Sequence, residues 1–167
     1  MAMNTLEHRI EDTAHDHNDC VADALATAER LCDERSLRFT SVRRRVLELV
    51  WDSHKPIGAY DILEVLNKET GSAAPPKVYR ALDFLIDAGL VHRLDSLNAF
   101  IGCPDPAQRH AGQFLICLEC RSVTELCDVE IENLVTQTAD RHDFSASRQM
   151  LEVEGLCKSC RTAAQSA

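Results

Sequence analysis

Cysteine is the residue type with the clearest chemical potential in this 167-residue chain, which contains eight of them. Four form two C-x2-C pairs, Cys117 with Cys120 and Cys157 with Cys160. Thiolates in two such pairs form the tetrahedral sulfur cage that zinc prefers, and a closed cage leaves no coordination position for a substrate. The pattern therefore predicts a structural zinc site. Because 36 residues separate the pairs, more than in a usual zinc ribbon, buried or disulfide-paired cysteines remain the alternative.

The composition is that of a globular protein, and we expect it to be cytoplasmic. No apolar run approaches the roughly 20 residues that span a bilayer. The N-terminus also lacks the charged and then apolar pattern of a secretion signal. We therefore expect no membrane partner. In a reducing compartment, cysteines favour metal binding or redox chemistry over disulfides.

The net charge of −9 conceals a basic middle segment. Acidic side chains outnumber basic ones nine to two in residues 1–34 and eleven to six in residues 94–167, whereas residues 35–93 carry ten basic and seven acidic side chains. Basic residues that could form a phosphate-binding face are Arg35, Arg38, Arg43, Arg44, Arg45, Lys55, Lys77, Arg80 and Arg93. Phosphate contacts dominate affinity for duplex DNA. An ordinary solvated helix surface is the alternative.

Residues 1–20 form a predicted N-terminal arm. The arm is acidic, and His8, His15, His17 and Cys20 occur in it without periodicity. We therefore expect a mobile segment that has weak metal affinity at most.

Apolar residues recur at helical spacing in three segments after the arm. The expected inward-facing residues are Leu25, Ala28 and Cys32 in the first, Val42, Val46, Leu49 and Val50 in the second, and Ile62, Leu63 and Leu66 in the third. Thr40 and Ser41 supply an N-cap for the second helix. Arg43, Arg44 and Arg45 point away from its apolar stripe, so this helix has one packed face and one basic face.

A fourth helix is predicted from Pro75 to Ala88, because proline is tolerated in the first helical turn. Its expected buried residues are Val78, Ala81, Leu82 and Leu85. Gly89 is placed to cap its C-terminus. Basic and aromatic side chains emerge near its start, as in the recognition helix of a helix-turn-helix. These side chains are Lys77, Tyr79 and Arg80.

Two short β-prone runs follow at residues 90–94 and 99–103, and the residues between them predict a hairpin. Helices followed by a hairpin form a winged helix, so residues 21–103 are predicted to be a winged-helix DNA-binding domain. Two prolines within residues 104–106 end this domain, because they cannot join a central strand or a helix interior. Residues 104–112 are the predicted hinge.

Residues 113–167 form the second predicted domain. Its expected elements are strands at residues 113–117, 123–126 and 147–156, and a helix that is capped by Asp128 and turns Ile131, Leu134 and Val135 toward the core. A unit of this size is only marginally stable by itself. We therefore expect both a metal clamp and an oligomeric interface. The predicted fold class is α+β, with an N-terminal winged helix-turn-helix domain and a small C-terminal α/β domain.

Several of these motifs together resemble the ferric uptake regulator family, and most of all its zinc uptake regulator branch. The similar segments are AYDIL at 59–63, PPKVYRALDFL at 75–85, GLVH at 89–92, CLEC at 117–120 and CKSC at 157–160. The resemblance covers residues 21–161. It implies a homodimeric, metal-dependent DNA-binding repressor whose C-terminal domain is the dimerisation and metal-binding domain.

The resemblance also implies two zinc ions per chain, one structural and one sensed. The structural zinc falls on Cys117, Cys120, Cys157 and Cys160, and the regulatory zinc falls on His92, Cys103, His110 and Glu125. Two imidazoles, a thiolate and a carboxylate suit zinc, and the thiolate disfavours harder ions such as manganese. Individually, His92 could be a surface histidine, Cys103 a core residue and Glu125 a solvated side chain. Cys127 remains a possible substitute for Glu125.

On DNA, Arg80 is expected to contact a base, because a guanidinium can bind a purine edge in the major groove in bidentate fashion. Tyr60 is expected to add an apolar or phosphate contact. The residues expected to contact phosphates, which position the protein without reading sequence, are Lys77, Tyr79, Arg43 and Arg44. Tyr79 could instead cover the core. A two-fold dimer requires an inverted-repeat operator.

These features predict a zinc-responsive repressor of zinc uptake genes. An iron- or peroxide-responsive regulator of the same family is the first alternative, and Cys103 and the absence of histidine from residues 94–102 argue against it. A zinc-trafficking module or a thiol-redox protein would belong to a different class. We expect no enzyme, because neither H-E-x-x-H nor the deaminase motif occurs.

Overall fold

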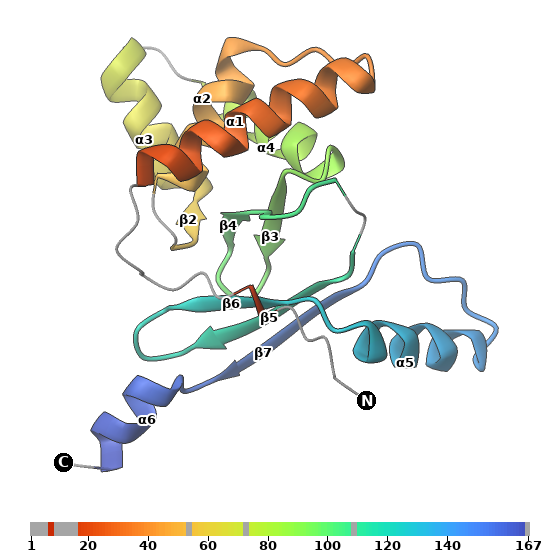
Figure 1. Ribbon diagram of the computed structural model, residues 1–167. Helices are drawn as coiled ribbons and strands as arrows, with labels where there is room; N and C mark the ends of the chain where they lie inside the picture. Colours follow the sequence, from red (N-terminus) through yellow and green to blue (C-terminus); the bar gives the residue numbers. More distant parts are fainter. Residues whose placement is uncertain (1–6, 9–16, 53–54, 72–73, 108–109, 166–167) are drawn as a thin grey trace. The chain divides into compact units, whose positions relative to one another are not determined.

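The structure of this protein is a computed structural model that describes residues 7–8, 17–52, 55–71, 74–107 and 110–165. The chain divides into two compact units (Figure 1). We call Asp12–Arg109 the helical unit, and Met1–Glu11 together with His110–Ala167 the sheet unit. The division between Arg109 and His110 falls within the predicted hinge. Apart from a short strand and the start of a helix, the predicted N-terminal arm lies outside the described residues.

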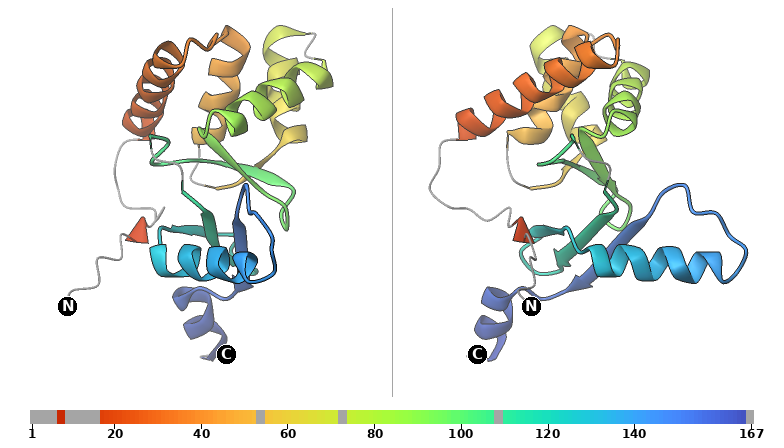
Figure 2. Two further views of the ribbon diagram at one scale, coloured as in Figure 1. Left: turned by 90° about the vertical axis from the view of Figure 1, so that its right-hand side faces the viewer. Right: turned by 45° about the vertical axis from the view of Figure 1, so that its right-hand side comes forward.

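The helical unit is built on helices whose apolar faces share one core. These are α1 (His17–Glu34), α2 (Ser41–Trp51), α3 (Ala59–Thr70) and α4 (Pro75–Asp87). Leu47, Ile62, Leu82 and Leu85 are fully buried at its centre. Figure 2 shows these helices on one side of a small sheet. Helix α1 begins at His17, before the predicted start at Val21.

The small sheet contains β2 (Ile57–Gly58), β3 (Val91–Leu94) and β4 (Ala99–Gly102), in the order β2-β4-β3. Strands β3 and β4 are antiparallel and form the predicted hairpin. Asn98 closes its turn with a φ of 47°, a conformation that asparagine tolerates better than most residues. Helices followed by this hairpin confirm the winged-helix prediction. Strand β2 was not expected, because two residues are too few for a periodic signal.

Helix α2 starts where predicted, but its buried residues include Leu47 in place of Val42. The Thr40 side chain accepts a hydrogen bond from the Arg43 backbone N–H at 3.4 Å, which confirms the N-cap. Val46, Leu49 and Val50 are buried. Val42 is 39% exposed, so its predicted inward position is wrong. It lies in the first turn, outside the cluster of core residues.

Helix α4 agrees with its prediction in detail. It starts at Pro75, and the residues predicted to be buried are Val78, Ala81, Leu82 and Leu85, all of which are buried. Gly89 follows the helix with a φ of 78°. Glycine adopts this left-handed conformation without the steric penalty that a Cβ introduces, so the chain can turn sharply into β3.

The sheet unit contains a four-stranded sheet in the order β1-β6-β5-β7. Its strands are β1 (Glu7–His8), β5 (Gly112–Cys117), β6 (Val123–Leu126) and β7 (Met150–Gly155). Strands β5 and β7 are parallel and the other pairs are antiparallel. Two helices complete the unit, α5 (Val129–Asp140) and α6 (Lys158–Gln165). Strand β1 and helix α6 were not expected.

The sheet has one buried face and one apolar face that the described residues leave open. Phe114, Ile116 and Val123 are buried on the first face. Leu115 and Val153 are register partners on the second face, and both are exposed. The open face is therefore available to another chain.

Helix α5 buries no residue within the chain. Figure 1 and the right view of Figure 2 show it extending from the end of β6 away from the strands. Asp128 caps it as predicted, accepting hydrogen bonds from the backbone N–H groups of Glu130 and Ile131. Leu134 is 62% exposed and Val135 is exposed too, so the prediction that they face the core of the chain is wrong.

Among the described residues, every helix is too short or too polar to cross a bilayer.

Candidate metal centres and nucleic-acid interface

The four predicted zinc-binding cysteines meet at one end of the sheet unit. Cys117 is the last residue of β5, and the parallel register places it beside Gly155, the last residue of β7. Cys157 and Cys160 follow β7, at the start of α6. The four sulfur atoms, including that of Cys120, all lie within 4.8 Å of one another. Pairing of two strands therefore joins thiols that are far apart in sequence.

The geometry of this cluster fits zinc. Sulfur atoms at about 2.3 Å from a tetrahedral zinc lie about 3.8 Å apart. The Sγ atoms of Cys120 and Cys157 are 3.8 Å apart. The Cys157 backbone N–H points at Cys117 Sγ over 3.4 Å, and the Cys160 N–H points at Cys157 Sγ over 3.5 Å. All four cysteines are free thiols, so the structure contains no disulfide among them.

Neighbouring groups set the protonation of these thiols. Hydrogen bonds from the backbone N–H groups of Cys157 and Cys120 lower the pKa of Cys117 to about 6. Hydrogen bonding to the sulfur atoms of Cys157 and Cys120 raises the pKa of Cys160 to about 12. The cluster therefore holds thiolates and thiols side by side, and zinc binding would release the remaining protons.

The predicted regulatory ligands divide between the two units, and the first two lie on the hairpin of the helical unit. His92 is on β3, and Cys103 directly follows β4. The Cys103 backbone N–H donates to the Leu90 carbonyl at 3.0 Å, which extends the hairpin by one pair. The ligand atoms of His92 and Cys103 lie within 4.8 Å of each other. Cys103 is buried and His92 is half-buried.

The other two predicted regulatory ligands meet in the sheet unit. His110 Nε2 lies 2.9 Å from Oε1 of Glu125. Glu125 is on β6, paired with Phe114 of β5, and it is fully buried. A buried carboxylate is costly unless a hydrogen-bonding or charged group compensates it. This environment differs from the solvated strand position that was the alternative for Glu125.

The predicted DNA-binding side chains of α3 and α4 are exposed, whereas Arg43 and Arg44 of α2 are half-buried. Lys77 and Arg80 are exposed near the start of α4. Tyr79 is 53% exposed, which leaves only part of its ring to cover the core. Tyr60 is 78% exposed in the first turn of α3. The first turns of α3 and α4 therefore both present polar or aromatic groups to solvent.

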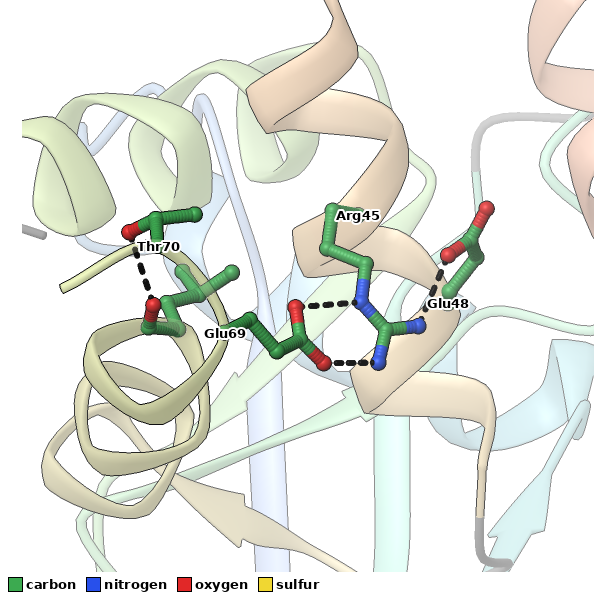
Figure 3. A network of polar contacts seen from close by, with 5 residues as sticks. Arg45, Glu48, Glu69 and Thr70 are labelled. Atoms are coloured by element: carbon green, nitrogen blue, oxygen red, sulfur yellow. Dashed lines mark hydrogen bonds and ion pairs between the residues drawn. The ribbon is translucent and has the colours of Figure 1, made fainter.

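Ion pairs within the chain divide the basic residues into two groups. Arg44 pairs with Glu29. Arg45 donates to Glu48 at 2.8 Å and, through Nε, to Glu69 at 3.1 Å, as Figure 3 shows. In the same way, Arg93 pairs with Asp95 and Lys68 with Glu64. Within the described part of the chain, Lys77 and Arg80 make no ion pair.

Arg43 has a different environment, which the sequence did not indicate. Its guanidinium lies over the Phe84 ring at 3.5 Å from the centroid, and it also donates to the Arg38 carbonyl. A cation over an aromatic face is attracted by the ring quadrupole. Phe84 therefore holds Arg43 against α4. No local sequence pattern links Arg43 with Phe84, because 40 residues lie between them.

Sequence comparison points to one family. The profile of the ferric uptake regulator family matches residues 34–154. The zinc uptake regulation protein of Escherichia coli K12 is 37% identical over 137 residues, which cover 81% of this chain and 80% of that protein. The region that the family profile matches contains α2, α3, α4, the hairpin and most of the sheet unit.

Solved structures agree with this similarity. A zinc uptake regulator complexed with zinc and DNA is 35% identical and has a TM-score of 0.82. The match covers 87% of this chain and 97% of the chain of that regulator. The structure of holo XcZur is 42% identical, has a TM-score of 0.77 and matches 84% of this chain and 98% of its own. The winged helix, the cysteine cluster and these similarities lead to one conclusion. The chain belongs to the ferric uptake regulator family.

Proposed function

We propose that this protein is a zinc-responsive transcriptional repressor, which binds an inverted-repeat operator as a homodimer and silences zinc uptake genes. The observation that supports this most is the similarity of 87% of the chain to a regulator bound to zinc and DNA. The exposed basic start of α4 supports the same function. As a repressor, the protein is cytoplasmic and is not an enzyme.

The structural zinc is held by Cys117, Cys120, Cys157 and Cys160. Four thiolates complete a tetrahedral shell, so this site has no open position for catalysis. Its role is to join the end of β5 to the segment that follows β7. In so small a unit, such a clamp contributes directly to folding.

The regulatory zinc is held by His92, Cys103, His110 and Glu125, so the chain binds two ions. The paired arrangement of His92 with Cys103, and of His110 with Glu125, supports this assignment. One pair comes from each unit. A shared ion would therefore restrict the movement of one unit relative to the other, which makes DNA affinity depend on zinc.

Operator binding uses the exposed side chains of α3 and α4. Arg80 contacts a base edge, and Tyr60 adds an apolar or phosphate contact. Lys77, Tyr79 and Arg43 contact phosphates. Arg44 belongs to the same group, although its ion pair with Glu29 must then exchange for the phosphate.

The homodimer forms through the sheet unit. Exposed apolar residues on its open face and on α5 are Leu115, Val129, Leu134, Val135, Leu151 and Val153. Large exposed apolar patches mark interaction sites. A second copy covering this surface would create a two-fold axis, and such a dimer requires an inverted-repeat operator.

Operator binding by metal variants tests this function. We expect Cys103→Ser to remain folded and dimeric, to keep one zinc per chain and to lose the zinc-dependent increase in operator affinity. We expect Cys117→Ser to lose the structural zinc together with the fold or the dimer. Equal operator affinity of the wild-type protein with its second site filled or stripped would refute the proposal.

Metal analysis separates zinc sensing from the iron or peroxide alternative. The protein is purified from cells grown with both metals, and the metal at the second site is measured. We expect zinc, because the Cys103 thiolate and two imidazoles favour it over harder ions. Iron at the second site would favour the alternative.

A further inference from the structure

A shallow hollow lies where the first turns of α2 and α4 meet in the helical unit. Its volume is about 190 Å³. The residues that line it are Thr40, Val42, Arg43, Lys77, Arg80 and Ala81. The Val42 and Ala81 side chains are apolar, whereas three of the other lining residues carry cationic groups on long aliphatic stems. The lining therefore combines apolar surface with three cations, Arg43, Lys77 and Arg80, which we call the rim.

The cations at this rim differ from those basic residues of the unit that pair with a carboxylate. Arg44, Arg45 and Arg93 each pair with a carboxylate of the chain. Arg43 instead lies over Phe84, and Lys77 and Arg80 make no ion pair within the described residues. Their charges remain available to an anionic partner.

Val42 is the feature that phosphate binding alone does not explain. The helical period of α2 places it with Val46, Leu49 and Val50, which are buried, yet Val42 is 39% exposed in the hollow. An apolar side chain surrounded by cations suits a partner that combines apolar and anionic groups. A nucleotide unit has this combination, because an apolar deoxyribose face lies between two phosphates.

We propose that the hollow receives the sugar-phosphate backbone of one operator strand, and that Val42 makes an apolar contact with a deoxyribose. This inference deepens the proposed function, since it requires that the protein binds DNA. Arg43 and Lys77 flank the sugar and contact its phosphates, while Arg80 is left to reach the bases. A thymine methyl group is the less suitable occupant, because one methyl would leave most of this volume and its charged rim unused.

The test compares Val42→Thr with Val42→Ile in zinc-loaded full-length protein. Threonine keeps the β-branched shape but replaces a methyl by a hydroxyl, whereas isoleucine stays apolar. Affinities are measured for an operator duplex and for a shuffled duplex of the same length and composition. We expect Val42→Thr to weaken both by the same factor, about fourfold for the loss of one methyl contact. We expect Val42→Ile to bind both within about twofold of wild type.

Three controls make the result specific. Thermal melting and zinc content should match wild type, because the side chain lies outside the core. The slope of log Kd against log salt should also stay unchanged, since no phosphate contact is removed. A loss confined to the operator, and abolished when deoxyuridine replaces thymine, would overturn the proposal in favour of a base contact. Unchanged affinity for both duplexes would overturn it as well, whereas failure of wild type to bind the operator would refute the proposed function itself.

Discussion

Three consecutive arginines in α2 illustrate how position decides the role of a charge. Arg43 lies over Phe84 at the rim of the hollow. Arg44 faces α1 and pairs with Glu29. Arg45 joins α2 to the last turn of α3 through Glu69 (Figure 3). Hydrogen bonding to Glu69 and Glu48 raises the pKa of Arg45, and the Arg45 guanidinium lowers the pKa of Glu69.

Arg43 and Arg45 should therefore differ in their effect on DNA binding. We expect Arg43→Gln to reduce the slope of log Kd against log salt by about one, because one phosphate contact is lost. We expect Arg45→Gln to leave this slope unchanged, because Glu69 and Glu48 already neutralise Arg45. Operator titrations at several salt concentrations measure both slopes. Equal slope changes in the two variants would contradict this division.

At the scale of elements, the end of α2 is fitted closely to the end of β4. A Cβ built on Gly102 would lie 2.2 Å from Cε2 of Trp51, far closer than atoms approach. Glycine therefore allows the Trp51 indole of α2 to approach the backbone of the strand that leads to Cys103. The helix and the hairpin share this contact, so each fixes the position of the other.

Substitution of Gly102 should be costly for this reason. We expect Gly102→Ala to lower the free energy of unfolding by about 1–3 kcal/mol, as overpacking does. Thermal or denaturant melting measures the loss. The double variant Gly102→Ala with Trp51→Leu should lose less than the sum of the single variants, because the smaller side chain relieves the clash. Additive losses would mean that the indole is not the obstacle.

Helix α5 is anchored to β5 at its start. The Gln113 side chain donates to the Asp128 carbonyl at 2.9 Å and accepts from the Asp128 N–H at 3.3 Å. This pair of hydrogen bonds fixes the N-cap residue to β5. Along the rest of the helix no residue is buried. The apolar side of α5 is thus positioned for a partner that the single chain does not supply.

A charge on this side should break the dimer. We expect Leu134→Glu to weaken dimerisation by at least about 100-fold, because a carboxylate would have to be buried without compensation. Sedimentation of the zinc-loaded protein measures the dissociation constant. Asn133→Glu places the same charge one position away, about 100° around the same helix from Leu134, and should remain dimeric. If both variants dimerise like wild type, the interface lies elsewhere.

At the scale of the whole molecule, zinc and DNA must influence each other equally. If regulatory zinc strengthens operator binding, operator DNA must strengthen zinc binding by the same factor, typically about 5- to 150-fold. Competition with a fluorescent zinc chelator measures this factor with the operator and with a shuffled duplex present. Cys103→Ser should show no such effect. The coupling would be contradicted if zinc increased operator affinity while the zinc affinity stayed the same with and without the operator.

The sequence by itself determined those features that depend on neighbouring residues. Pro75 and Gly89 delimit α4, and Thr40 and Asp128 cap α2 and α5, because each acts on the backbone within a few positions. Helical spacing likewise identified the buried residues of α4. The two C-x2-C pairs indicated zinc because their spacing already places two thiols in one loop. Fold class and the cysteine cluster were predictable for this reason.

Contacts between residues that are distant in sequence became visible only in the folded structure. The period of α2 could not show that Val42 faces a hollow formed with α4, nor that Arg43 lies over Phe84. Leu134 fits a core by its spacing, yet it is 62% exposed, because spacing alone does not distinguish a side chain that faces the core from one that faces outward. The approach of His110 to Glu125 depends on strand register. In each case the deciding contact is non-local, and a local pattern carries no information about it.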